Sequence, residues 1–261
     1  MEASPQDFYF FDFDKNIMAV KVPLVITNSE TKVQKDVSAK EYFGTIKDQL
    51  GKEGPYKDWN ASDLFMYYGD KPDTPPDKQY FIQQIRLAVD SSSQKWQAPA
   101  WKLFVYVCNQ QKPFSLITAR SHSDATIKAG FEFLKQDGWI KHVPHYLTIY
   151  NVGYPSTKKE LSGDDPTISD DALKGVAINK SVHKAVEEFG IGAHHFGMSD
   201  DTLTNIDASA HAMSLCKDEF PEMRFFVLST NALQNYRAEI FRFDVPDAGE
   251  LETTGSGPLG I

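Results

Sequence analysis

Two aspartates, Asp12 and Asp14, lie at the end of the aromatic run FYFFDF, residues 8–13. Carboxylates avoid a protein interior unless they are paired or bound to a cation. Because side chains alternate along an extended segment, Asp12 and Asp14 project to the same side. The run therefore predicts either a strand that ends at a working site or a surface turn after a strand.

Three further polar features accompany later apolar runs. Thr118 is near the end of FSLITA (114–119), and Asp200 and Asp201 directly follow AHHFGMS (193–199). Lys180 opens a helical segment upstream of that second run. In an open α/β sheet, functional sites collect at the carboxyl ends of the strands, so we expect these side chains to converge.

Four carboxylates can share a small site only when a cation offsets their charge. Mg²⁺ takes oxygen ligands, typically one or two carboxylates together with substrate phosphate and water. The predicted metal ligands are Asp12, Asp14, Asp200 and Asp201.

The same residues predict phosphoryl transfer. Asp12 is the expected nucleophile, which would form an aspartyl-phosphate. Asp14 is the expected acid that protonates the leaving alcohol and then the base that activates water. The Thr118 hydroxyl and the Lys180 ammonium would bind the anionic group beside the ion.

Apolar runs separated by helical segments predict the elements that position these residues. Continuous apolar strands alternating with helices indicate an α/β fold with a doubly wound, mostly parallel sheet. The expected strands are 8–13, 114–119, 145–150, 193–199, 223–230 and 237–243. The expected helices are 124–138, beginning at Asp124, 179–190, beginning at Asn179, and 204–220, with further helical pieces at 38–50 and 78–91.

The amino-acid composition changes between about residues 20 and 98, a segment rich in Gly, Pro and charged residues. We interpret 21–98 as an insertion after the first strand, so that 1–20 and 99–244 form the core domain. Residues 150–175 are interpreted as a long polar loop and 245–261 as a flexible tail.

Four of these segments resemble, in order, the signature motifs of the haloacid dehalogenase (HAD) superfamily. They are FFDFDKNI, FSLITAR, the lysine of NKSVHKAVEEFG, and HFGMSDDTLTNIDA. The resemblance implies a Rossmann-like three-layer core with a C1-type cap inserted after the first strand, and a Mg²⁺-dependent phosphatase. It also implies that the main-chain carbonyl of Asp14 binds the metal. Lys180 matches the third-motif lysine, with Lys184 as the alternative.

The chain departs from the family pattern after Asp14. Many members have Gly-Thr there, whereas this chain has Lys15 and Asn16. Because glycine permits unusual backbone conformations, Lys15 predicts a more ordinary backbone, and its side chain could contact substrate.

Several side chains near the motifs have two interpretations. Arg120 either holds a substrate anion with its fork of donors or pairs with a core carboxylate. Asn205 either orients a metal-bound water or caps the following helix, and the cap is favoured. For His122 a capping or surface role is favoured.

Other residues give a weaker functional signal. The aromatic residues of the insertion are interpreted mainly as its small core; any that face the active-site mouth would favour a flat or aromatic leaving group. They are Trp59, Phe65, Tyr67, Tyr68 and Tyr80. The histidine spacings do not predict a zinc site, and Cys108 and Cys216 are expected to be buried free thiols.

Composition excludes several functional classes. The formal charge is −9 with a pI near 5.3, so there is no basic footprint for nucleic acid. No run of 18 apolar residues predicts a membrane span, and no cleaved signal sequence is evident, so we expect a cytoplasmic protein.

The sequence therefore predicts a Mg²⁺-dependent phosphatase acting on a phosphomonoester, small molecule or phosphoprotein, through phospho-Asp12. Two alternatives stay open: a phosphotransferase with the same intermediate, and a non-catalytic HAD-fold binding protein. No motif in the insertion identifies the substrate.

Overall fold

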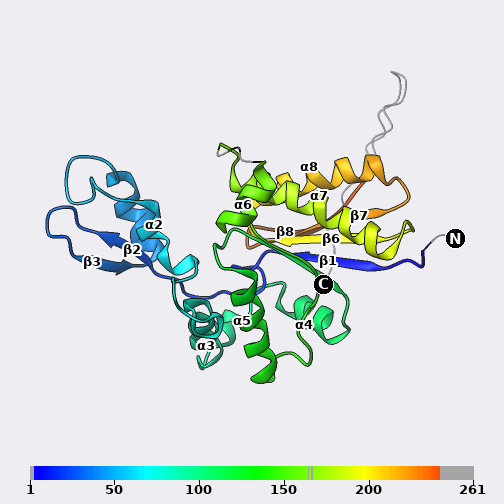
Figure 1. The fold of residues 1–261 in the computed structure, drawn as a ribbon, viewed down its shortest axis with the longest axis horizontal. Coiled ribbons are helices and arrows are strands. Elements are labelled where there is room, and N and C mark those ends of the chain that lie inside the picture. Colours follow the sequence, from blue (N-terminus) through cyan, green and yellow to red (C-terminus); the bar gives the residue numbers. More distant parts are fainter. Residues whose placement is uncertain (1–2, 164, 166, 242–261) are drawn as a thin grey trace, which may run out of the picture.

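The computed structural model of this chain describes residues 3–163, 165 and 167–241, and it is built around a six-stranded sheet (Figure 1). The strand order is β5-β4-β1-β6-β7-β8, and only β8 runs antiparallel to its neighbour. The strands are β1 (Asp7–Phe11), β4 (Pro113–Thr118), β5 (His145–Asn151), β6 (His195–Asp200), β7 (Arg224–Asn231) and β8 (Gln234–Ile240). The predicted mostly parallel, Rossmann-like α/β sheet is confirmed. The predicted tail, 245–261, lies outside the described residues.

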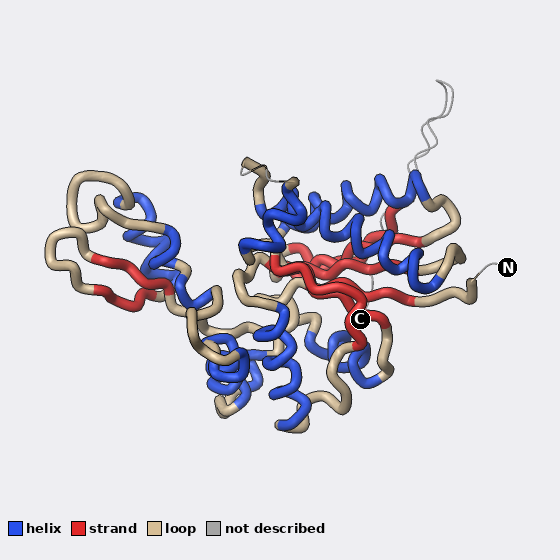
Figure 2. The backbone as a smooth tube through the Cα atoms, viewed as in Figure 1, coloured by secondary structure: helices blue, strands red, loops and turns tan. Residues whose placement is uncertain are grey.

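Helices cover both faces of the sheet, which makes three layers (Figure 2). One face packs against α3 (Tyr80–Val89), α4 (Trp101–Asn109) and α5 (Asp124–Gln136). The other packs against α6 (Pro155–Ser162), α7 (Asp170–Phe189) and α8 (Leu203–Glu219).

The aromatic run at the start of the chain is buried because it lies in the middle of these layers. Phe8 and Phe10 pack into the α6–α8 side, and Phe11 and Phe13 pack into the α3–α5 side. Each of these rings is at most 1% exposed. Burial of each phenylalanine side chain stabilises the native state by about 1.5–3 kcal/mol. This burial fixes the position of β1 and of the residues that follow it.

Residues 21–68 form a small lobe that projects from the core (Figure 1). Its hairpin joins β2 (Leu24–Thr27) to β3 (Gln34–Val37), and its own apolar cluster includes Ile26, Tyr42 and Leu64. The remaining elements of the lobe are α1 (Ala39–Glu41), η1 (Tyr42–Ile46), η2 (Lys47–Gln49), α2 (Ala61–Leu64) and η3 (Met66–Tyr68). The short η4 (Pro76–Lys78) lies in the segment that leads back to the core, and η5 (Gln94–Trp96) follows α3.

The insertion expected at 21–98 is not one structural unit. Phe81, Ile82 and Ile85 of α3 belong to the core cluster, as does Trp96 of η5. The second half of the predicted insertion is therefore part of the layer that covers β1 and β4.

The prediction of a long polar loop at residues 150–175 was wrong. α6 occupies residues 155–162, and α7 begins at Asp170, nine residues before the predicted start at Asn179. The hydroxyl of Ser169 accepts a hydrogen bond from the Ala172 N–H and caps α7. The small and acidic residues of this first turn resemble loop composition, which concealed the helix start.

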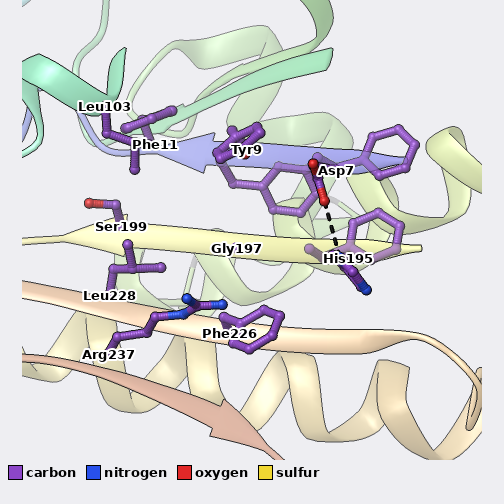
Figure 3. A pocket seen from close by; sticks show the side chains of 13 residues that line it. Asp7, Tyr9, Phe11, Leu103, His195, Gly197, Ser199, Phe226, Leu228 and Arg237 are labelled. Atoms are coloured by element: carbon purple, nitrogen blue, oxygen red, sulfur yellow. Dashed lines mark hydrogen bonds and ion pairs between the residues drawn. The ribbon is translucent and has the colours of Figure 1, made fainter. Parts of the chain in front are cut away.

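The face of β6–β8 opposite α7 and α8 has a shallow hollow of about 230 Å³ (Figure 3). Its floor is formed by alternate side chains such as Phe226 and Leu228, and the Arg237 guanidinium lies 4.1 Å from the Phe226 ring centre. Asp7 and His195 contact each other at 3.0 Å at one end of the hollow. The predicted metal ligands are not among the residues that line it.

In the described part of the chain, no helix is long and apolar enough to cross a membrane.

Candidate active site

Asp12 is brought beside Asp200 and Asp201 by the pairing of β1 with β6. The register places Phe11 opposite Ser199, so the residues after each strand end are neighbours. The Asp12 N–H donates to the Ser199 carbonyl at 2.9 Å. One carboxylate oxygen from each of the three aspartates lies within 4.8 Å of the others. This cluster of Asp12, Asp200 and Asp201 is the carboxylate cluster.

Lys174 neutralises part of the carboxylate cluster. Its Nζ donates to Asp12 Oδ1 at 2.9 Å and to Asp200 Oδ2 at 2.8 Å, and the residue is 2% exposed. With all three carboxylates ionised, one ammonium leaves two negative charges unbalanced. A divalent cation fits that charge and the oxygen donor set.

The structure does not bring the predicted lysine to this site. Lys180 is partly exposed and pairs with Glu160 at 3.0 Å, and Lys184 pairs with Glu187 and Glu188. Six helical residues rotate the direction of a side chain by about 600°, so Lys174 and Lys180 project from different sides of α7. Lys174 was missed because it lies in the segment interpreted as a loop.

Asp14 stands outside the carboxylate cluster because Arg120 holds both of its oxygens. Arg120 Nε donates to Asp14 Oδ2 at 2.8 Å and Nη2 donates to Oδ1 at 2.7 Å. Arg120 Nη1 also donates to Gln84 Oε1 at 3.1 Å. Of the two interpretations of Arg120, the structure therefore favours pairing with a carboxylate. The predicted group of four side-chain carboxylates is reduced to three.

Asn16 ties together the ends of three strands. Its Nδ2 donates to the carbonyls of Asp12 and Ser199, and its Oδ1 accepts from the hydroxyls of Ser199 and Thr230. The side chain is fully buried, and all four of its hydrogen-bonding positions are used. Asn16 thus fixes the spacing between Asp12 and the end of β6.

Lys15 adopts a left-handed backbone conformation with φ of +54°, so the prediction of an ordinary backbone was wrong. The Lys15 N–H donates to the Met18 carbonyl at 2.8 Å, which closes a tight turn directly after Asp14. A side chain in this region costs roughly 1–2 kcal/mol, which the surrounding structure must offset.

Thr118 and Asn151 are paired residues at the ends of β4 and β5. Both side chains are buried, and neither Thr118 Oγ1 nor Asn151 Oδ1 has a hydrogen-bond partner among the described residues. Asn151 Nδ2 donates to Asp124 Oδ1 at 3.3 Å. An unpaired buried hydroxyl is costly, and an oxygen of a bound anion would satisfy it. Sequence analysis did not identify Asn151.

Asn205 and His122 take roles other than those favoured from sequence. Asn205 Nδ2 donates to both oxygens of Asp200 at 3.0 Å, whereas Thr202 is the residue at the start of α8. His122 is fully buried against the Phe81 ring, and burial followed by the charge of Arg120 lowers its pKa to about 2. The imidazole is therefore neutral.

The electrostatics of the carboxylate cluster favour a cation. Burial raises the pKa of Asp12 to about 7; Lys174 opposes this effect and Asp200 reinforces it. Burial and then the Asp200 carboxylate raise the pKa of Asp201. Burial would lower the pKa of Lys174, but Asp12 and Asp200 outweigh it, so its pKa lies above the usual value.

Comparisons with known proteins add no relative. No family model matches the chain, and no curated protein or solved structure matches it.

Proposed function

We propose that the chain is a Mg²⁺-dependent phosphatase of the HAD type that hydrolyses a phosphomonoester through a phospho-Asp12 intermediate. The observation that carries this proposal is the bridge from Lys174 Nζ to Asp12 and Asp200 inside the carboxylate cluster. Buried carboxylates are costly, so a chain that places a third carboxylate beside two buried ones bridged by one ammonium has a reason in function rather than in stability.

Asp12, Asp200 and Asp201 would hold Mg²⁺, which offsets the repulsion between a carboxylate nucleophile and a phosphate dianion. Lys174 binds one oxygen of Asp12 and thereby orients the other toward the substrate. The unpaired Thr118 hydroxyl donates to a phosphate oxygen.

In the first half-reaction, Asp12 forms a bond to phosphorus while the ester oxygen leaves with its electron pair and takes a proton from Asp14. In the second, Asp14 takes a proton from water, the water oxygen bonds to phosphorus, and the bond to Asp12 breaks. Because Arg120 donates one N–H to each oxygen of Asp14, the proton that Asp14 transfers must lie on a lone pair that Arg120 leaves free.

The small lobe at residues 21–68 is the proposed cap. Its residues Tyr67 and Tyr68 reach the core next to the site, where the Tyr67 carbonyl accepts from Gln84 Nε2 and the Tyr68 carbonyl accepts from the Ser121 N–H. A lobe placed there would exclude water while the aspartyl-phosphate forms.

The direct test is hydrolysis of a chromogenic aryl phosphate with Mg²⁺, with EDTA, and with Asp12→Asn. We expect a requirement for Mg²⁺ and a loss of at least about 10³-fold in kcat for the folded Asp12→Asn variant. Inactivity of the wild type on a broad panel of phosphomonoesters, or full activity of Asp12→Asn, would refute the phosphatase and favour the non-catalytic binding protein. A phosphotransferase would release the aryl group but pass the phosphoryl group to an added alcohol in preference to water.

A further inference from the structure

A cleft of about 940 Å³ lies between the lobe and the core. One wall is the end of the lobe and the segment that returns to α3, and the other is formed by the loops after β4 and β5. The cleft is thus at the carboxyl edge of the sheet, where the carboxylate cluster also lies. The residues that line it include Phe65, Met66, Tyr67, Asp70, Tyr80 and Ser121.

The returning segment is held in shape by a buried side chain. Gln79, 2% exposed, accepts from the Lys71 N–H and donates to the carbonyls of Lys71 and Thr74. A binding wall that is already ordered loses little conformational entropy when a ligand arrives.

The cleft is joined to the active site through Arg120. Gln84 contacts both regions, because its Nε2 donates to the Tyr67 carbonyl and its Oε1 accepts from Arg120. The Arg120 guanidinium also lies 5.5 Å from the ring centre of Tyr68 while it holds Asp14. Tyr67, which lines the cleft, is therefore linked through Gln84 and Arg120 to Asp14, the residue that serves the leaving group.

Aromatic and sulfur-containing side chains give the cleft its character. Phe65 and Met66 are each 46% exposed, although Phe65 was expected to help form the core of the insertion. Tyr67 and Tyr80 stack with ring centres 4.0 Å apart and an angle of 20°. Exposed π faces and a thioether favour contact with a planar aromatic group.

Asp70 adds a directional requirement. Its Oδ2 accepts from the Ser123 N–H at 3.0 Å, and its Oδ1 is buried without a partner among the described residues. A carboxylate oxygen can only accept, so the complementary ligand atom is an N–H or O–H donor.

We propose that this cleft binds the leaving-group half of the substrate, and that this half is a planar aromatic group carrying an N–H or O–H donor. The assignment rests on the proposed function for the position of the phosphate. It disfavours aliphatic sugar phosphates and polyol phosphates, because the exposed aromatic side chains would have no planar partner and, among the described residues that line the cleft, Asp70 alone has a buried acceptor without a partner.

Kinetics with three esters test the proposal. 4-Aminophenyl and 4-methylphenyl phosphate have leaving phenols of similar acidity and differ in the donor; cyclohexyl phosphate lacks the aromatic ring. We expect Phe65→Ala to lower kcat/KM for both aryl esters by about tenfold, mainly through KM, because loss of one aromatic contact typically has this effect. Asp70→Asn should remove the preference for the amino ester over the methyl ester and leave the methyl ester unchanged.

Phe43→Ala is the matched control, because Phe43 is an exposed aromatic side chain of the same lobe, 64% exposed, that does not line the cleft. Equal effects of Phe65→Ala and Phe43→Ala, or an unchanged preference in Asp70→Asn, would overturn the proposal.

A binding experiment without phosphate separates this proposal from the phosphatase. Saturation-transfer NMR with 4-aminophenol should show contact with the wild type and Asp12→Asn, and clearly weaker contact with Phe65→Ala. Contact that depends on Phe65 in a protein without hydrolytic activity would refute the phosphatase alone. Hydrolysis with no such dependence would refute the cleft assignment alone.

Discussion

The carboxylate cluster and the cleft lie at the same edge of the molecule but are built in opposite ways. In the cluster, Lys174 and Asp200 are at most 2% exposed, and their charged atoms have short hydrogen bonds to groups on three elements. In the cleft, Phe65 and Met66 are nearly half exposed, and it is the neighbouring carbonyls of Tyr67 and Tyr68 that accept hydrogen bonds from the core. Chemistry needs fixed geometry, whereas selection of a ligand needs accessible surface, and the two regions divide these requirements.

Lys174 gives the largest expected contrast. Lys174→Met should lower kcat/KM by about 10²–10³-fold, because it removes a donor from the reacting carboxylate. Without Mg²⁺ it should also lower the free energy of unfolding by about 3–5 kcal/mol, because Asp12 and Asp200 are left buried without their partner.

Lys180→Met is the control for Lys174→Met, since Lys180 is on the same helix with a surface partner. We expect less than a twofold change in kcat/KM and at most about 0.5 kcal/mol in stability. Steady-state kinetics and urea unfolding measure both. A larger effect of Lys180→Met would restore the lysine favoured from the sequence.

Asn16 and Asn60 compare polar anchors in the core and in the lobe. Asn16→Ala removes one hydrogen bond from each of four polar groups at the strand ends and should cost about 2–4 kcal/mol, with slower turnover. Asn60 caps α2 in the lobe by accepting from the Asp63 N–H, and Asn60→Ala should cost about 1 kcal/mol with unchanged turnover. Urea unfolding measures the loss of stability in the two variants. Similar losses would show that polar anchors contribute no more to stability in the core than in the lobe.

The pH dependence of Mg²⁺ binding tests the raised pKa of Asp12. Because Mg²⁺ competes with the proton on Asp12, its affinity should rise between pH 6 and 8 and then level off. Isothermal titration calorimetry measures this profile, and Asp12→Asn should flatten it. A wild-type affinity that does not change over this range would contradict the assignment.

Without Mg²⁺, the same group makes folding less favourable as pH rises. Between about pH 4 and 7 the native state keeps the Asp12 proton that the unfolded chain has lost, so stability falls with rising pH. Thermal unfolding of the wild type and of Asp12→Asn at several pH values measures this contribution as the difference between their pH dependences. Saturating Mg²⁺ should reduce that difference.

Lys15 and Lys32 give the smallest effect. Both have positive φ, +54° beside the site and +59° in the lobe. In each Lys→Gly variant, glycine relieves the strain of a Cβ at positive φ, which stabilises the native state. Glycine also makes the unfolded chain more flexible, which nearly cancels this gain, so stability should rise by less than about 1 kcal/mol. Only Lys15→Gly should change KM, because the Lys15 charge acts on Asp201. Thermal unfolding measures the stability of both variants, and initial rates measure KM. A KM change in Lys32→Gly would contradict the prediction that only Lys15 influences the site.

The parallel sheet and part of the site were predictable because they depend on local patterns. Apolar runs mark buried strands wherever they lie in the chain, and the carboxyl ends of parallel strands meet by topology. For that reason Asp12, Asp200 and Asp201 were correctly expected to converge. The lysine was not predictable, because the choice depends on where α7 begins, and a helix start rich in Ser and Asp resembles a loop.

Lys15 and Phe65 show a second limit. Glycine is the residue expected at positive φ, but the hydrogen bonds around residues 12–18 hold Lys15 in that conformation despite its local preference. Aromatic residues are expected in cores, but the lobe buries Leu24, Ile26 and Leu64 and leaves Phe65 in the cleft.

By itself, the sequence determined that carboxylates follow buried strands at two points of an acidic α/β chain, because burial and strand periodicity depend on local sequence. Only the tertiary structure decided which charges pair: Lys174 with Asp12 and Asp200, and Arg120 with Asp14. These partners lie 26, 106 and 162 residues apart. Helix rotation and strand register select them, and Coulomb energy depends on the resulting distances rather than on separation along the chain.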